Sequence, residues 1–444
     1  MNSISFVKID RSTPQKVEVD LKYSGEMRRF FNGNVFFVEY DVPIDSVPES
    51  ILVVPALATL VPVAWACNAD VYVPQIDEEF MKSLEELKYT FRDFHPSISW
   101  NGQLHSHNII NKVNKPMQEK SKSAIMFSGG VDSLFSFIRH KSDLLDLITV
   151  NGSDIDINNA KGWANAMEKL QPTAKLNKVR HFTIRSNFRS ILDYKMLSAR
   201  FIKPLSRGWW PNVQADLGLV GLCAPLTYVR DINKLYLASG FPMNFYSHVS
   251  PRPCIHNKVR WSNTIVSEDG FEFTRQEKIH FLADYIRSEN SNLYIRTCWE
   301  SDTGGNCSKC EKCSRTIVGL ELEGINPNKH GYKVDERTFG YIKTQLETKK
   351  WHFDVGKEFF WDDLKSHIDL NRIFPHPEAR EFMLWLAKVD IHSMRSHDRE
   401  SKVLTNIKRS LTYLPKPIVR LLFWLFKCLK KFYLILFMDG YNVK

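Results

Sequence analysis

The sequence predicts an α/β protein whose core is a doubly wound parallel sheet. From Lys122 onward, short apolar strands alternate with helical segments, which is the pattern of strands joined by crossover helices. A serine- and glycine-rich turn follows the first of these strands, and four cysteines lie close together near the end of the same region. These three observations predict a nucleotide-binding sheet that is braced by a metal ion.

The composition is that of a globular protein with more than one core. The chain has 444 residues, of which 43% are hydrophobic and 25% are charged. Its formal charge of +10 favours an anionic partner, such as a nucleotide, RNA or an acidic protein surface. The first sixteen residues lack the basic start and apolar run of a secretory signal, so we expect a cytoplasmic protein.

Three regions are expected along the chain. Residues 1–115 predict an N-terminal α+β module, with strands at 17–21 and 35–40 and a helix whose apolar stripe runs from Phe80 to Phe94. The polar stretch from Asn101 to Lys122 is interpreted as a linker into the next domain. Residues 116–320 form the predicted catalytic domain, and residues 321–444 form a helical C-terminal region.

The predicted core elements follow from the alternation of short apolar runs with longer periodic segments. They are strands at residues 124–127, 147–150, 181–184, 235–238 and 293–297, with a buried helix at 213–229.

Two apolar stretches resemble membrane spans, but neither fits a bilayer. Residues 51–67 are uncharged, yet Pro55 and Pro62 interrupt them, and we interpret the stretch as buried strands and turns. Residues 418–438 carry four basic side chains in their interior. They predict a basic amphipathic helix that packs on its own chain, a partner or a membrane surface, with no stable membrane span.

The segment from Ser128 to Ser133 is a strand-to-helix turn suited to phosphate. Gly129 and Gly130 let the backbone approach an anion closely, and the amides at the start of the next helix point toward it. Ser128 and Ser133 add hydroxyl donors. Asp132 is expected either to hold a Mg²⁺ ion that bridges the phosphates or to cap the helix.

The run Ser-Gly-Gly-Val-Asp-Ser resembles the pyrophosphate loop of the N-type ATP pyrophosphatases, which split ATP between its α and β phosphates. The resemblance implies that ATP and Mg²⁺ bind here. It also implies that Ser128, Gly129, Gly130, Val131, Asp132 and Ser133 contact the cofactor, with Asp132 and Ser133 catalytic.

Cys298, Cys307, Cys310 and Cys313 are separated by eight, two and two residues. A short loop with this spacing can wrap one metal ion with four thiolates, and a closed set of four sulfurs predicts a structural Zn²⁺ site. An iron–sulfur cluster and unliganded thiols are the alternatives.

The loop and the cysteine spacing together resemble the 7-cyano-7-deazaguanine synthase (QueC) family over residues 120–320. The chain is longer, as are the QueC-like components of bacterial anti-phage systems, notably QatC of the Qat system. The resemblance implies an enzyme with a pyrophosphatase fold of the HUP-like class. It would adenylate a deazapurine substrate, 7-carboxy-7-deazaguanine, and act with a protein partner from the same defence system.

Four further residues are candidates for cofactor contacts. Asn151 and Gly152 follow the second core strand, Gly240 follows the fourth, and Arg275 precedes an amphipathic helix. The carboxyl ends of such strands are where doubly wound folds bind ligands. Ordinary turn residues and a plain surface charge are the competing interpretations.

Two other functions stay open at this point. A tRNA-modifying enzyme could use the same loop to adenylate a base, and the basic charge permits RNA as a partner. A nucleotide-binding scaffold of a defence complex would need the loop only for binding. Salt-sensitive binding of tRNA would distinguish the tRNA-modifying enzyme from the deazaguanine enzyme. A lack of turnover would distinguish the scaffold.

Overall fold

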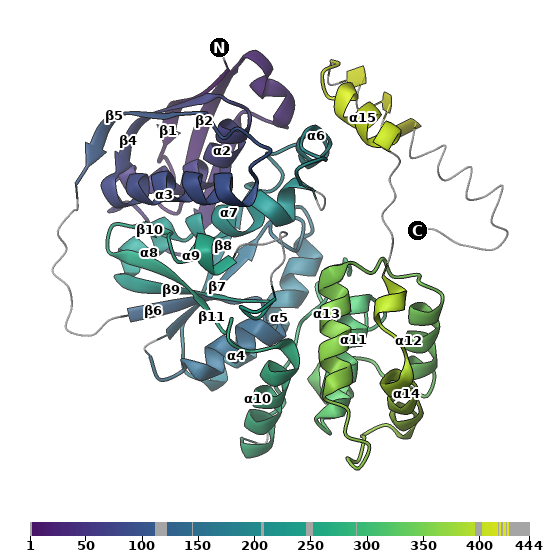
Figure 1. The fold of residues 1–444 in the computed structure, drawn as a ribbon. Coiled ribbons are helices and arrows are strands. Elements are labelled where there is room, and N and C mark those ends of the chain that lie inside the picture. The colour runs from purple at the N-terminus through teal and green to yellow at the C-terminus, as the bar shows by residue number, and fades with distance from the viewer. Residues whose placement is uncertain are drawn as a thin grey trace.

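In the computed structural model, the described residues form one mixed sheet of eleven strands, with helices on both of its faces (Figure 1). The structure describes residues 2–111, 122–143, 145–205, 208–245, 252–289, 291–395, 402–415, 417–418, 421–422 and 424–425. The strand order is β10-β11-β9-β6-β7-β8-β3-β2-β1-β4-β5.

The strands are β1 (Ser3–Asp10), β2 (Lys16–Ser24), β3 (Val35–Tyr40), β4 (Asp70–Asp77), β5 (Leu104–Ile110), β6 (Lys122–Met126), β7 (Leu145–Asn151), β8 (His181–Ser186), β9 (Ile232–Ala238), β10 (Arg260–Trp261) and β11 (Thr264–Asp269). The α-helices are α1 (Glu49–Leu52), α2 (Val54–Ala66), α3 (Glu78–Phe94), α4 (Val131–Arg139), α5 (Ala160–Leu176), α6 (Tyr194–Arg200), α7 (Ala215–Gly221), α8 (Ala224–Arg230), α9 (Arg252–His256), α10 (Arg275–Ser288), α11 (Glu311–Leu322), α12 (Thr338–Glu347), α13 (Val355–Ser366), α14 (Pro377–Lys388) and α15 (Lys402–Leu411). Short 3-10 helices are η1 (Gly25–Phe30), η3 (Pro327–His330) and η4 (His392–Met394), and η2 (Trp210–Gln214) is a π-helix.

The catalytic-domain candidate is built on five parallel strands with β6 in the middle. The chain runs outward from β6 to β7 and β8, then returns to the other side of β6 to form β9 and β11. This reversal is the doubly wound arrangement, and it places the switch between β6 and β9. The predicted α/β class with a mostly parallel central sheet is therefore confirmed, as are four of the five predicted core strands.

The N-terminal strands extend the same sheet. β3 pairs antiparallel with β8, with Val38 opposite Ser186 and Tyr40 opposite Ile184. The strands predicted at 17–21 and 35–40 lie in β2 and β3. The strands of residues 1–115 and those of the predicted catalytic domain therefore belong to one sheet, joined through the pairing of β3 with β8.

The prediction of strands and turns at residues 51–67 is wrong, because this stretch forms α1 and α2. Pro55 lies in the first turn of α2, where a missing N–H leaves no helical bond unmade. Pro62 lies inside the helix, but every residue of α2 is buried. Burial on all sides stabilises the helix and offsets the free-energy cost of the internal proline. Local helix propensity does not indicate this tertiary burial.

Three other segments also differ from expectation. Residues 104–110, interpreted as linker, form β5, which pairs in parallel with β4. Residues 293–297 are not a strand, since the backbone N–H groups of Ile295 and Arg296 donate to the carbonyls of His330 and Gly129 instead of to a sheet. The helix expected at 213–229 is divided into the end of η2, α7 and α8.

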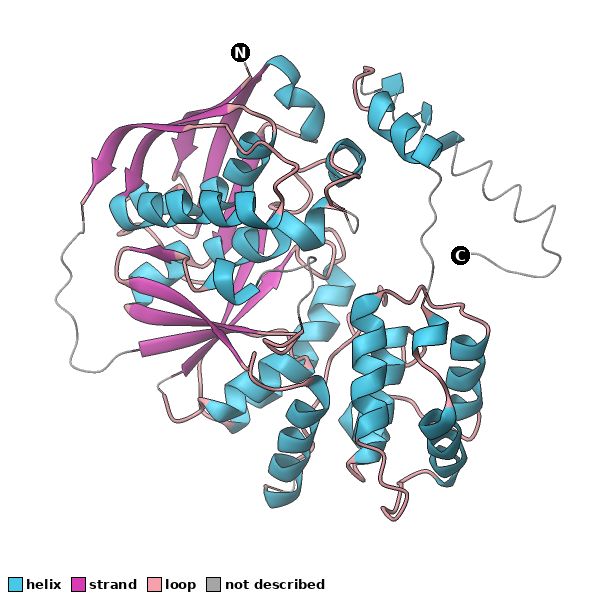
Figure 2. Cartoon of the chain, viewed as in Figure 1, coloured by secondary structure: helices cyan, strands magenta, loops and turns pink. Residues whose placement is uncertain are grey.

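The sheet separates two hydrophobic cores. Successive side chains of β6 point to opposite faces, so Ala124 and Met126 join one core while Ile125 and Phe127 join the other. The first core also contains the N-terminal strands and α2. The second contains α10, α11 and the C-terminal helices α12–α14, which gather on one side of the sheet (Figure 2). The predicted helical C-terminal region is thus present, whereas most of the helix predicted at 418–438 lies outside the described residues.

Candidate functional site

The predicted phosphate loop connects β6 to α4. Ser133 Oγ donates to the carbonyl oxygen of Gly130 at 3.1 Å, and Ser128 Oγ lies 3.3 Å from Ser133 Oγ. The same Ser128 oxygen accepts from the N–H of Gly130 at 3.3 Å. α4 starts with Gly130 as its N-cap and has no side-chain cap, so Asp132 does not cap the helix. The two serine hydroxyls therefore face each other across the turn.

The backbone of the turn requires glycine at its first position. Gly129 has a φ of +73°, and a Cβ there would overlap a methyl group of Leu170 on α5. Its carbonyl oxygen accepts a 2.7 Å hydrogen bond from the N–H of Arg296. The turn is therefore held from both sides, by a helix and by the segment that leads into the cysteine cluster.

A hollow of about 210 Å³ opens beside this turn. It lies at the carboxyl ends of β6, β7 and β9, which is the switch point where open α/β sheets bind ligands. Polar side chains from the turn and from the loop after β7 line it, with an aromatic side chain from α5 and a cation from the segment before the cysteines. These residues are Ser128, Asp132, Ser133, Asp154, Trp163 and Arg296.

Asp132 is surrounded by cations. Arg275 Nη2 donates to its Oδ2 at 2.6 Å, and Lys278 Nζ lies 3.6 Å from its Oδ1. Arg275 and Arg315 both lie against the ring of Phe360, with guanidinium carbons 5.1 and 3.8 Å from its centroid. Asp132 therefore faces several positive charges, and one of the cations, Arg315, also pairs with Glu311, its Nε 3.2 Å from Oε1.

The neighbouring cations change the pKa of Asp132. Burial by itself raises the pKa of Asp132, but Arg275, Lys278, Lys312 and Arg315 outweigh it, so the pKa of this carboxyl lies below its ordinary value. Burial lowers the pKa of Lys278 and of Lys312, and that of Arg315 to about 10. Glu311 also acts on Arg315, Asp154 on Lys312 and Asp269 on Lys278, while Asp132 is the carboxylate on which all four cations act.

Three helices begin at this cluster. Asp132 lies in the first turn of α4, Arg275 opens α10, and Lys312 lies in the first turn of α11. The N-terminus of each helix carries the positive end of its dipole, and that of α4 also lacks a side-chain cap. Among the described residues, Arg275 Nε and Arg315 Nη1 are buried without a hydrogen-bond partner. This is the electrostatic environment of an anion-binding site.

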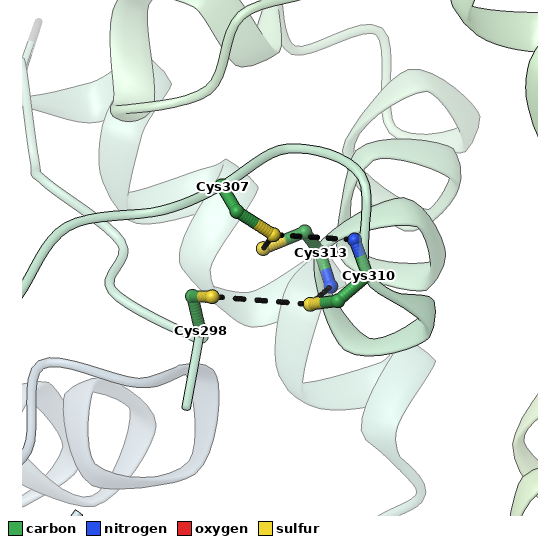
Figure 3. Close-up of side chains that lie close together, drawn as sticks. All are labelled: Cys298, Cys307, Cys310 and Cys313. Carbon is green, nitrogen blue, oxygen red and sulfur yellow. Dashed lines mark hydrogen bonds between the residues drawn. The ribbon is translucent and has the colours of Figure 1, made fainter. Parts of the chain in front are cut away.

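The four predicted metal ligands do lie together (Figure 3). All four sulfur atoms are within 4.8 Å of one another, and the Cys298–Cys310 and Cys307–Cys313 sulfurs are each 3.9 Å apart. A tetrahedral Zn²⁺ with bonds of about 2.3 Å separates its sulfurs by about 3.8 Å. The cluster is compatible with one zinc ion, and its spacing fits four thiolate ligands.

The cysteine cluster is joined directly to the anion site. Cys310 caps α11 by accepting from the N–H of Cys313, so the cluster fixes the start of the helix that carries Lys312 and Arg315. Arg296, two residues before Cys298, binds the phosphate turn through its backbone and lines the hollow. Lys312 and Arg315 both lower the pKa of Asp132.

The structure brings two of the weaker candidates to the site. Gly240 follows β9, and a Cβ built on it would lie 3.9 Å from Arg275 Nη2. Gly152, with a φ of +97°, makes the turn that carries Asp154 into the hollow. Asn151 lines a neighbouring hollow. The candidates therefore share one region of the sheet edge but do not all face the phosphate turn.

Sequence reasoning missed Lys278 and Trp163 as site residues. Lys278 is one helical turn after Arg275, a spacing that places both on the same side of α10. That spacing was the available signal. Trp163 carried none, because its position depends on how α5 packs against the sheet.

No helix among the described residues is long and apolar enough to cross a membrane. Among the described residues, Asp132 Oδ1 accepts no hydrogen bond, and Lys278 Nζ lies 3.6 Å from it, so a Mg²⁺ ion at this oxygen would share it with a cation. Comparisons of the chain with protein families, with curated proteins and with solved structures found no match.

Proposed function

We propose that the chain is an ATP-dependent ligase that splits ATP into AMP and pyrophosphate and joins the AMP to a carboxylate. The observation that carries this proposal is the meeting of the phosphate turn, the hollow at the switch point and four cations around Asp132. A leaving pyrophosphate carries several negative charges. Buried cations and three helix N-termini stabilise such charge as it develops.

In this reaction a carboxylate oxygen of the substrate attacks the α-phosphorus of ATP. The bond from that phosphorus to the bridging oxygen breaks, and pyrophosphate leaves with the electron pair. Ser128, Ser133 and the N–H groups at the start of α4 orient the phosphates, while Arg275, Lys278 and Arg315 balance their charge. Mg²⁺, when bound, supplies further neutralisation of the phosphates, with Asp132 as its protein ligand.

The proposed substrate is of the 7-deazaguanine type, because the loop and the cysteine spacing resemble those of the QueC-like enzymes. The product would be an amide, a nitrile or a protein conjugate. The role would be bacterial anti-phage defence with a protein partner. Zinc would be structural, since the four thiolates leave no open position for water.

The test measures pyrophosphate release from ATP and Mg²⁺ with 7-carboxy-7-deazaguanine. It is run with ammonia, without an acceptor and with a candidate partner protein, and the products are identified by mass spectrometry. We expect pyrophosphate release that depends on the deazaguanine and is lost in Asp132→Asn. Glu168→Gln, a surface change on α5 with a side chain that is 71% exposed, is the matched control.

Pyrophosphate release with tRNA alone would replace the deazaguanine substrate with an RNA base. Nucleotide binding without release under any condition would contradict the enzyme and favour a scaffold.

A further inference from the structure

A second hollow lies beside the first, where the N-terminal strands join the parallel sheet. It has a volume of about 240 Å³ and lies where β3, β7 and β8 run side by side. Trp163 of α5 lines both hollows, so the two hollows share this side chain. β3 belongs to the N-terminal region, which therefore contributes directly to the surroundings of the phosphate site.

The lining of this second hollow is rich in hydrogen-bond acceptors. Glu39 and Asp41 come from the end of β3, and Asn151 ends β7. Arg185 is the cation that lines the hollow, and it is already engaged: Nη1 lies 3.2 Å from Glu39 and the guanidinium lies over the ring of Phe37. Asp41 Oδ2 accepts from the N–H and hydroxyl of Thr183. Among the described residues, Asp41 has no ion pair.

The hollow also contains a buried acceptor without a donor. Asn151 is 6% exposed, and its Oδ1 has no hydrogen-bond partner among the described residues. An acceptor buried in this way costs free energy unless a ligand supplies an N–H or O–H. Asp41 lies at the exposed side of the hollow, where partial burial raises its pKa and the hydrogen bonds from Thr183 lower it. A positive ligand that donates N–H groups would pair with Asp41 and satisfy Asn151 Oδ1.

The geometry points to a binding site for a small alkylammonium ion, a protonated primary amine of the kind that ends a lysine side chain. Its N–H groups would donate to Asp41 and Asn151, and its charge would lie near the indole of Trp163, the ring that attracts cations most strongly. An anion is disfavoured by the two carboxylates, and an apolar ligand would leave Asn151 Oδ1 unpaired.

The assignment of this amine as the second substrate of the ligase rests on the proposed function. After losing one proton to solvent, its nitrogen would bond to the acyl carbon of the adenylate, and it would lose a second proton to solvent as the amide forms. The bond from that carbon to the AMP oxygen would break, and AMP would leave with the electron pair. Binding of the amine needs none of these steps.

The test is therefore made without ATP. The protein is labelled with 5-fluorotryptophan, and the ¹⁹F resonance of Trp163 is identified by its loss in Trp163→Phe. Nα-acetyl-lysine methylamide is titrated against it, with the Nε-acetylated, neutral compound as the matched ligand. We expect a saturable shift with the charged ligand only, and a Kd weakened at least about tenfold in Asp41→Asn.

Glu168→Gln on α5 is the control variant and should keep the affinity of the wild type. If Asp41→Asn fails to fold, Glu39→Gln provides a second test of the carboxylates that line the hollow. Asp132→Asn should still bind the amine, so loss of ATP splitting and loss of amine binding are separable results. Equal shifts with the neutral ligand, no shift at all, or a shift with guanosine but not with the amine would each overturn the proposal.

Discussion

Asp132 is the carboxylate on which four neighbouring cations act, and this arrangement has energetic consequences. Each of the four lowers the pKa of Asp132; burial lowers the pKa of Lys278, Lys312 and Arg315, and the charge of Arg275 adds to that effect. An anionic ligand would relieve this repulsion. This repulsion is the reason that we propose a phosphate site here and not only a set of structural ion pairs.

Replacing Asp132 by Asn should lower the free energy of unfolding by about 3–5 kcal/mol, since it leaves buried cations without their partner. Inorganic pyrophosphate should restore part of this loss. Urea denaturation with and without pyrophosphate measures both effects. Asp284→Asn, on the exposed side of α10, is the control. Equal stability of wild type and Asp132→Asn would show that the cations are not mutually destabilising.

His181 gives a pH-dependent prediction. Burial lowers its pKa to about 4, from an ordinary value of 6.5, and its Nε2 lies 2.7 Å from Thr149 Oγ1. The folded protein therefore holds it neutral, while the unfolded chain binds a proton below about pH 6.5. Its contribution to stability is complete above that pH and is lost as the pH falls toward 4.

The contribution of His181 is tested by measuring the free energy of unfolding of the wild type and of His181→Gln at pH 7 and at pH 5. The wild type should lose more stability between the two values than the variant, because glutamine does not titrate. A difference of the same size in both proteins would contradict the role of His181.

At the scale of elements, the cysteine cluster links metal binding to phosphate binding. It fixes the start of α11 and the segment that holds Gly129. Cys307→Ser should therefore reduce bound zinc, measured by elemental analysis, and weaken pyrophosphate binding at least about tenfold. Cys254→Ser, at an exposed cysteine outside the cluster, is the control. Loss of zinc with unchanged pyrophosphate affinity would separate the two sites.

The loop between Cys298 and Cys307 packs tightly against the start of α5. Gly304 has a φ of +76°, and a Cβ there would overlap the carbonyl oxygen of Gly162. Gly304→Ala should lower the free energy of unfolding by about 1–3 kcal/mol. Gly340→Ala in α12 is the matched control, since a Cβ there meets nothing within 4 Å, and it should stabilise by about 0.5–1 kcal/mol. Thermal unfolding of the two variants compares them directly.

The sequence predicted those parts of the fold and of the site that depend on residues close to one another along the chain. The turn from Ser128 to Ser133, the four cysteines and most core strands have local signals. Residues 51–67 were misassigned because tertiary burial, which local pattern does not show, makes a helix of them. The cluster of Asp132 with Lys278 and Arg315 was missed for a similar reason, since it forms only when α4, α10 and α11 pack together.

At the scale of the whole molecule, the single sheet makes the N-terminal region part of the core. Deleting residues 1–115 would expose the edge of β8 and remove much of one hydrophobic core. The remaining chain should be insoluble or aggregate. Soluble yield and the circular dichroism of the purified fragment measure this. A folded fragment that binds pyrophosphate normally would show that the core is independent.

The pairing of β3 with β8 also constrains how the chain folds during synthesis. A hydrogen bond from the N–H of Phe37 to Asn187 joins residues 150 apart. At about 5–20 residues per second, β3 waits about 8–30 s on the ribosome before its partner emerges. For that interval β3 is an open edge, and the central junction of the sheet can close only after almost half of the polypeptide has been made.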